Sequence, residues 1–243
     1  MIFSVHIPKT AGTSFRNALK ERYGDRLALY YGPNDPATHP LLKVSRRALA
    51  DQVPALESAG IEVLHGHYTL DTVKDAVDDP SRQVITWLRD PIDRLVSHYS
   101  FIKERPTKWA FDKEIKSGAL PLVSFARKRR IRNMATRYLG GYALEDLAFV
   151  GVTERFELGL AMLFGEEAPV LSRRYNAVSE LVDVSPRTRQ KLYALNIADI
   201  RLYGEACRLM MDRVAASKAV IMPPRPEIAG TGVVRRLIRR AQI

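Results

Sequence analysis

The most informative segment of this 243-residue chain is VHIPKTAGTSF, residues 5–15. An apolar run enters a turn rich in small and hydroxyl residues, and a pattern with helical period leaves it. In such a joint the amides of Gly12, Thr13 and Ser14 would point outward at a helix N-terminus, which attracts an anion. Lys9 would add a mobile positive charge, and Gly12 would allow a tight turn with close backbone approach.

The stretch is not the common nucleotide loop G-x-x-x-x-G-K-[ST], because Lys9 precedes the glycine. An ordinary strand–turn–helix joint with capping Thr and Ser residues is the alternative interpretation. The combination of Lys9, Gly12, Thr13 and Ser14 favours an anion site over that alternative.

Strand-like runs alternate with helical patterns along the chain, which indicates an α/β fold with a central, mainly parallel sheet flanked by helices. Strands are expected at residues 1–7, 26–32, 61–67, 83–88 and 147–154. Helices are expected at 13–24, 41–58, 70–77, 92–104, 155–165, 186–194 and 197–217, with short helices and loops over 105–145. We expect one domain over residues 1–222, followed by a linker and a basic amphipathic tail over 223–243.

A second polar turn, RDP at residues 89–91, follows the expected strand at 83–88. The planar guanidinium of Arg89 can bind a phosphate through two parallel hydrogen bonds, and Ser97, about two turns into the next helix, can donate another. A buried structural pair of Arg89 with Asp90 is the alternative. Ligands of parallel sheets bind at the carboxyl ends of strands, so two anion sites at such ends predict a ligand with two separate phosphate groups.

The segment VLHGHYTLD places His65 and His67 at the end of another expected strand. At this spacing the two imidazoles share one face of the sheet. Imidazole titrates near neutral pH, which suits a general base. One structural and one exposed histidine would be the alternative. The other histidines, His6, His39 and His98, are expected to be structural or on the surface.

These motifs carry a family resemblance. HIPKTAGTSF resembles the 5′-phosphosulfate loop of the sulfotransferase superfamily, and LRDPIDRLVSHYSF resembles its 3′-phosphate motif. RNMATRYLGG (132–141) and FVGVTERFELGLAML (149–163) are similar to later blocks of the Golgi-type carbohydrate sulfotransferases, the group that includes heparan sulfate 2-O-sulfotransferase, and of their bacterial relatives. The resemblance spans about residues 2–165 and, more weakly, 187–206.

The resemblance implies a P-loop-like three-layer sandwich and a PAPS-dependent sulfotransferase. The donor would be 3′-phosphoadenosine 5′-phosphosulfate (PAPS), which leaves as the bisphosphate PAP, and no metal would be required. The acceptor would be a hydroxyl of a carbohydrate or glycolipid, attacked directly and in line. The family's second H-G-H histidine acts as the base, and that position matches His67.

The same resemblance implies roles for the remaining site residues. His65 would orient the base or contact the substrate, and Lys9 would stabilise charge on the leaving phosphate. The donor-binding residues implied are Lys9, Thr10, Ala11, Gly12, Thr13, Ser14, Arg89 and Ser97.

Composition limits the compartment and the partners. Thirty-eight basic and 27 acidic residues give a net charge of +11, which favours anionic partners. Aromatic residues are not interleaved with the basic clusters, so a nucleic-acid partner is not expected. No run approaches the roughly 20 apolar residues of a membrane span, and residues 2–7 already form a strand pattern in place of a leader. We expect a cytoplasmic protein whose tail could contact a membrane surface through Arg235, Arg236, Arg239 and Arg240.

Two further features complete the sequence picture. Cys207 is the only cysteine, which excludes intrachain disulfides and cysteine-rich metal sites, and its apolar helical setting predicts a buried, inert thiol. Residues 127–137, RKRRIRNMATR, hold six basic side chains, which form either a solvated face or a groove for an acidic acceptor. Within this block the roles of Arg132, Asn133 and Arg137 stay open. Acceptor specificity is expected to reside in the loops at 33–40, 105–121 and 166–180.

Two other functions remain possible from sequence. A P-loop kinase using ATP would need the standard nucleotide loop and a carboxylate for magnesium after a strand, and neither is evident. A non-catalytic protein that binds anionic glycan or nucleic acid would need only the positive charge.

Overall fold

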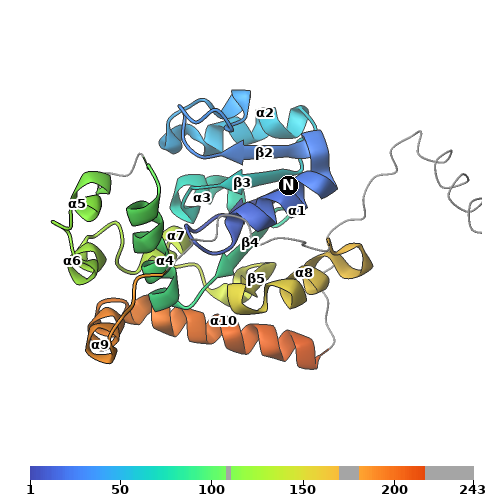
Figure 1. The fold of residues 1–243 in the computed structure, drawn as a ribbon. Helices are drawn as coiled ribbons and strands as arrows, with labels where there is room; N and C mark the ends of the chain where they lie inside the picture. Colours follow the sequence, from blue (N-terminus) through green and yellow to red (C-terminus); the bar gives the residue numbers. More distant parts are fainter. Residues whose placement is uncertain (108–110, 170–180, 217–243) are drawn as a thin grey trace, which may run out of the picture.

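The computed structural model describes residues 1–107, 111–169 and 181–216. Within these residues five strands form one sheet in the order β2-β3-β1-β4-β5, and every neighbouring pair is parallel (Figure 1). This confirms the expected α/β class with a parallel central sheet. Their bounds are β1 (Ile2–Val5), β2 (Leu27–Tyr30), β3 (Val63–Gly66), β4 (Gln83–Leu88) and β5 (Phe149–Val152).

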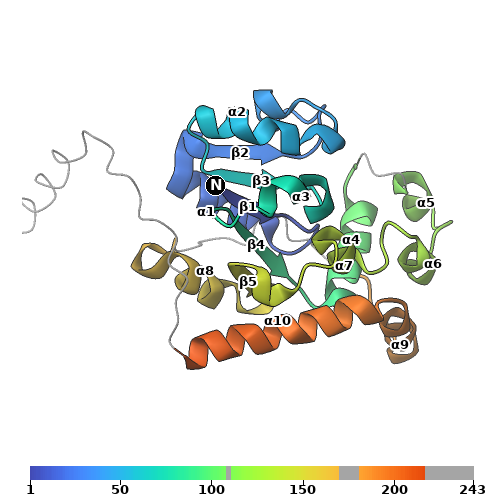
Figure 2. The same cartoon turned by 180° about the vertical axis from the view of Figure 1, so that it is seen from behind.

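Helices cover both faces of the sheet. One face carries α1 (Gly12–Tyr23) and α8 (Phe156–Phe164), and Figure 2 shows α3 (Lys74–Val77) and α7 (Met134–Leu139) on the other. The long α10 (Ile197–Ala215) runs along the β5 edge. The remaining helices are α2 (Val53–Ser58), α4 (Pro91–Glu104), α5 (Asp112–Lys116), α6 (Leu122–Arg127) and α9 (Pro186–Leu195).

The four-residue strands are buried along their whole length, which is why they read as continuous apolar runs in the sequence. On the α1 and α8 face the ring of Trp87 lies 5.4 Å from that of Phe15 and 4.4 Å from that of Phe156. Gly151 and Gly159 make room for this indole, since a Cβ at either position would fall 2.4 or 2.6 Å from it. The aromatic contacts therefore attach α1 and α8 to the sheet through one side chain.

The single helix expected over 41–58 is wrong in its first part. Short 3-10 turns at Pro40–Leu42, Arg46–Ala48 and Ala50–Gln52 precede α2. The extended backbone of Ser45, with ψ of 152°, interrupts any continuous helix there. The breaks let Leu42 and Leu49 both reach the core, where each is fully buried.

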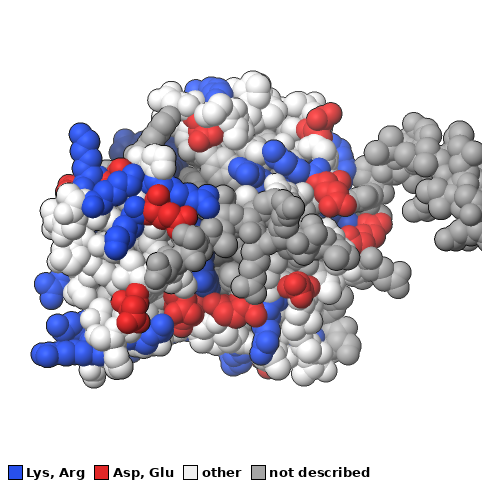
Figure 3. Space-filling view, in the orientation of Figure 1, with Lys and Arg blue, Asp and Glu red and all other residues white. Residues whose placement is uncertain are grey.

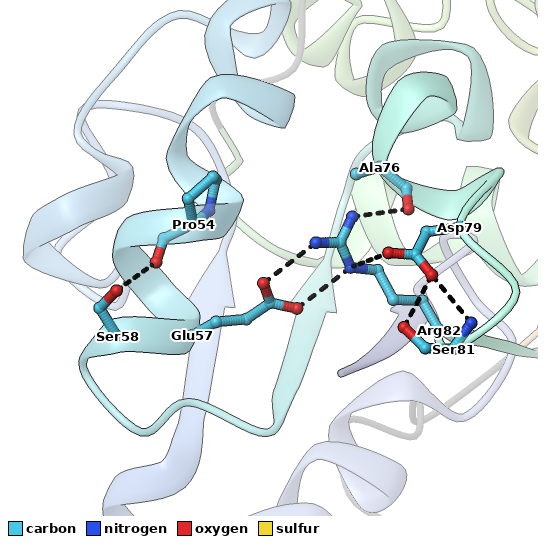
Figure 4. A network of polar contacts seen from close by, with 7 residues as sticks. All are labelled: Pro54, Glu57, Ser58, Ala76, Asp79, Ser81 and Arg82. Atoms are coloured by element: carbon cyan, nitrogen blue, oxygen red, sulfur yellow. Dashed lines mark hydrogen bonds and ion pairs between the residues drawn. The ribbon is translucent and has the colours of Figure 1, made fainter.

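At the amino ends of the strands, Arg82 joins α2 to the turn before β4 (Figure 4). Its guanidinium donates to both carboxylate oxygens of Glu57 at 3.0 Å and to the carbonyl of Ala76 at 2.9 Å. Asp79 accepts from the backbone and hydroxyl of Ser81 and lies 3.9 Å from Arg82. This network lies at the amino ends of the strands, whereas the predicted site lies at their carboxyl ends.

Two expectations need comment. Cys207 on α10 is half-buried against the core, so the prediction of full burial is too strong. The linker and tail expected at 223–243 lie outside the described residues. No helix in the described part of the chain is long and apolar enough to cross a membrane.

Candidate functional site

The loop between β1 and α1 has an unusual backbone. Lys9 and Ala11 both adopt positive φ, at 72° and 60°, a region that costs an L-residue about 1–2 kcal/mol. The hydroxyl of Thr10 donates to the carbonyl of Ile7 at 2.9 Å and is buried, so this side chain braces the loop from inside. Any contact of Thr10 with a ligand would therefore come from its backbone amide.

The start of α1 is suited to an anion. Its N-cap, Ala11, provides no side-chain acceptor, and the first turn holds no acidic residue. Gly12, Thr13 and Ser14 form this first turn, so their amides precede the intrahelical hydrogen bonds that begin with Phe15 donating to Ala11. The structure thus places the predicted amides in a first turn that holds no acidic residue of its own.

Gly12 does not supply the positive φ of the expected tight turn. The turn takes its positive φ values at Lys9 and Ala11, whereas Gly12 is an ordinary first-turn helical residue. A Cβ at Gly12 would fall 1.7 Å from Nε2 of His6. A side chain at position 12 would therefore have to displace the imidazole ring of His6.

Lys9 and Arg89 bring the two predicted anion sites together. Nη1 of Arg89, which follows β4, donates to the carbonyl of Lys9 at 3.3 Å. Nζ of Lys9 lies 4.0 Å from the ring centroid of Phe101 on α4. Burial, followed by the nearby charges of Arg89 and Arg105, lowers the pKa of Lys9 to about 8. Both sites therefore share one positive region at the carboxyl ends of β1 and β4.

Asp90 does not form the structural pair with Arg89 that the sequence left open. Its carboxylate caps α4 by accepting from the amides of Ile92 and Asp93, each at 2.9 Å, and Pro91 occupies the first turn. Ser97 lies two turns further along α4 and is 6% exposed. The guanidinium of Arg89 is consequently not held by a carboxylate of its own turn.

Arg94, in the same motif, is a residue that sequence reasoning missed. It is 1% exposed, and burial lowers its pKa to about 10. Its guanidinium donates to the carbonyl of Ile131 and to the sulfur of Met134, each at 3.3 Å. The motif arginine therefore ties α4 to the start of the 132–141 block.

His65 lies in β3, next to β1, and His67 follows directly after the strand. His65 is 1% exposed, its Nδ1 lies 2.8 Å from the hydroxyl of Ser4, and its buried Nε2 has no hydrogen-bond partner. His67 is half-buried and donates from Nδ1 to the carbonyl of His6 at 2.7 Å. Burial lowers the pKa of His65 to about 3 and that of His67 to about 4, so both rings are neutral at neutral pH.

His6 belongs to this cluster, although the sequence suggested only a structural or surface role. Its ring centroid lies 4.3 Å from that of His67 and 5.1 Å from that of His65. Tyr31, after β2, places its hydroxyl 3.4 Å from Nδ1 of His6, and the guanidinium of Arg16 on α1 lies 5.6 Å from the Tyr31 ring. The missing signal was the strand order, because pairing of Ser4 with His65 puts His6 beside His67 two residues later.

The basic block at 127–137 divides into two kinds of residue. Five of its cations are exposed, and Lys and Arg side chains gather over the side of the molecule that carries α5, α6 and α9 (Figure 3). Arg137 instead donates to the backbone carbonyls of Arg129, Arg130 and Arg132, which closes the turn before α7. Arg137 therefore has a structural role, and the five exposed cations fit either of the two expected interpretations, a solvated face or a groove for an acidic acceptor.

No family model and no curated protein sequence matches the chain. Among solved structures, mouse sulfotransferase SULT7A1 complexed with PAP is 12% identical, with a TM-score of 0.48 over 88% of each chain. A sulfotransferase from Alicyclobacillus acidocaldarius is 18% identical, with a TM-score of 0.43 over 86% of this chain and 95% of that one.

Proposed function

We propose that this chain is a sulfotransferase that moves a sulfuryl group from PAPS to an acceptor hydroxyl. One observation carries the proposal: Arg89 donates to the Lys9 carbonyl at 3.3 Å, so two loops with phosphate-binding residues meet beside a neutral histidine pair. The motif resemblance in residues 5–15 and 88–101 supports the same assignment.

The site has the topology expected for such a ligand. β1 is the central strand, β3 with His67 lies on one side, and β4 with Arg89 lies on the other. The connection that follows β1 runs toward the β2 edge, whereas the connection after β3 crosses β1 to reach β4. Ligands of open parallel sheets bind where the strand order reverses in this way.

The residues fit a donor with phosphates at two ends. The uncapped, acid-free N-terminus of α1 and the Lys9 ammonium would hold the 5′ end. Arg89 and Ser97 would hold the 3′-phosphate, the guanidinium through two parallel hydrogen bonds. PAPS, when bound, supplies a sulfuryl group whose bond to the 5′-phosphate is the one that breaks.

His67 is the proposed base. Its Nδ1 hydrogen is committed to the His6 carbonyl, so Nε2 is the nitrogen that can accept the acceptor's hydroxyl proton. As the acceptor oxygen forms its bond to sulfur, that proton passes to Nε2, and the displaced phosphate oxygen keeps the electron pair under the charge of Lys9. The buried His65 suits the orienting one of its two proposed roles, because it is 1% exposed.

The acceptor class rests on resemblance. The later sequence blocks are similar to those of carbohydrate sulfotransferases, so we propose a hydroxyl of a carbohydrate or glycolipid, modified in the cytoplasm. A contact of the basic tail with a membrane surface belongs to the same proposal.

Two measurements test this function. Calorimetry should show binding of adenosine 3′,5′-bisphosphate without magnesium in preference to ATP. Labelled sulfate should then pass from PAPS to a component in a screen of host glycans and lipids. Preference for magnesium-ATP would support a kinase instead. Glycan binding that survives Lys9→Ala, with no sulfate transferred at all, would support a non-catalytic binder.

A further inference from the structure

The side chain of His6 lies between the two parts of the proposed site. On one side its Nε2 occupies the space where a Gly12 side chain would be, since a Cβ there would be 1.7 Å away. On the other side its ring lies 4.3 Å from the His67 ring. One imidazole therefore separates the first turn of α1 from the proposed base.

The backbone of His6 is fixed to β3 at both of its polar groups. Its amide donates to the carbonyl of Gly66 at 2.8 Å, and its carbonyl accepts from Nδ1 of His67 at 2.7 Å. These bonds extend the β1–β3 pairing past its last register pair, Val5 with Gly66. The ring of His6 thus projects from a backbone that has little freedom to move relative to His67.

The groups around His6 favour a neutral ring. Burial is the largest cause that lowers the pKa of His6 well below its usual value, and the neighbouring positive or ionisable groups lower it further. Replacing the ring with a neutral side chain would therefore change packing without changing charge. The groups that face it are His65 in β3, His67 after β3, Lys9 in the loop, Arg16 on α1 and Tyr31 after β2.

We propose that His6 is a positioning residue that sets the spacing between the anion loop and the base. Its packing against Gly12 locates the first turn of α1, and its packing against His67 fixes the angle at which Nε2 faces the acceptor. The expected effect of His6 on sulfate transfer rests on the proposed function. The expected effect of His6 on the His67 ring does not, so the positioning role and the sulfotransferase proposal can fail separately.

Histidine NMR tests the spacing without any donor. His6→Ala opens the packing around His67, so the titration midpoint of His67 should rise toward the ordinary value of about 6.5. His6→Phe keeps a neutral ring in place and should stay close to the wild type. His39→Ala, in a surface loop, is the control. An unchanged His67 midpoint in His6→Ala, or equal shifts in the Ala and Phe variants, would overturn the proposal.

A double-mutant cycle tests the contact with Gly12. Gly12→Ala in the wild-type background forces the His6 ring aside and should lower bisphosphate affinity about tenfold and kcat by more. In the His6→Ala background the same methyl group meets no ring, so its cost should largely disappear. Gly204→Ala is a matched control, because a Cβ on this helical glycine meets no neighbour within 4 Å.

If the losses of bisphosphate affinity and kcat from Gly12→Ala and His6→Ala are additive, the contact between His6 and position 12 is not the cause of the Gly12→Ala effect. If His6→Ala does not fold, the Gly12→Ala variant alone still decides, since it must shift the His67 NMR signals while Gly204→Ala does not. If the wild type binds no bisphosphate, the sulfotransferase proposal fails, and the NMR measurement continues to test the role of His6.

Discussion

Nδ1 of His67 donates to the carbonyl oxygen of His6 over 2.7 Å. Because a carbonyl can only accept, this bond fixes the tautomer and leaves Nε2 as the basic nitrogen. Burial lowers the pKa of His67 to about 4, so the ring is in its proton-accepting form throughout the neutral range. An anionic ligand bound nearby favours the protonated ring and therefore raises this pKa.

The pH dependence of transfer follows from that bond. A base works only when unprotonated, so activity should fall as the pH decreases through the pKa of His67. The acid limb of kcat/KM, which reports the free enzyme, should lie near pH about 4, and that of kcat should lie higher, because the bound donor raises the pKa. Initial rates across the pH range check this, and an acid limb of kcat below that of kcat/KM would contradict it.

His67→Ala removes the proposed base. The variant should lose about 10²- to 10⁴-fold in kcat while bisphosphate affinity stays unchanged, since the residue belongs to the acceptor side. Single-turnover transfer and calorimetry measure the two quantities, with Gly204→Ala as the control, because a Cβ there meets no neighbour within 4 Å. Full activity in His67→Ala would rule out the base assignment.

Lys9 should take up a proton when the bisphosphate binds. Its pKa is lowered to about 8 in the free protein, and a bound anion raises it again. At pH about 8 the uptake should approach half a proton per site. Calorimetry in buffers of different ionisation enthalpy measures it, and Lys9→Ala should abolish both this uptake and sulfate transfer. Equal uptake in the variant would assign the proton to another group.

Arg89 should dominate affinity for the bisphosphate. Arg89→Ala removes charged hydrogen bonds worth about 1.5–3 kcal/mol, so affinity should fall roughly 10- to 100-fold. Arg89→Lys should recover only part of it, because an ammonium lacks the planar fork. Arg82→Ala is the matched control at the opposite end of β4, where it breaks the Glu57 pair without touching the site. Unchanged affinity in Arg89→Ala would remove the second phosphate site.

Asp199 on α10 is expected to stabilise the start of α7. It is 1% exposed and accepts from the amides of Ala135 and Thr136 at 3.0 and 2.8 Å, and from the Thr136 hydroxyl at 2.8 Å. Asp199→Ala leaves these donors unsatisfied and should reduce the free energy of unfolding by about 2–3 kcal/mol. Urea unfolding measures the change, and Asp212→Ala, at an exposed position of the same helix, should cost far less. Equal losses in both would show that the cap contributes nothing specific.

Local patterns predicted the regular elements well. The apolar run at 83–88 matches β4 residue for residue, and Gly24 ends α1 with a φ of 52°, as expected for a C-terminal glycine. The 41–58 segment failed because its apolar residues suit a helix, but several short turns bury them equally well. Helical periodicity alone cannot separate these two solutions.

Candidate site residues could be named from the sequence only where a single motif held the information. Lys9, Arg89 and His67 each follow a strand, and parallel pairing brings strand ends together. The role of His6 depends on which strand neighbours β1, and the reason for Gly12 depends on His6. Neither relation is visible until the strand order is known, because both join residues from segments far apart in the sequence.

The central place of β1 also constrains how the chain assembles. β1 contacts strands that come much later in the sequence. Ser4 contacts His65, 61 positions downstream, and Val5 contacts Thr86, 81 positions downstream. During synthesis on a ribosome, the backbone groups on both edges of β1 therefore stay unpaired with the sheet until β3 and then β4 have emerged. Open strand edges can pair with other chains, so β1 is exposed to such pairing until β3 and β4 have been made.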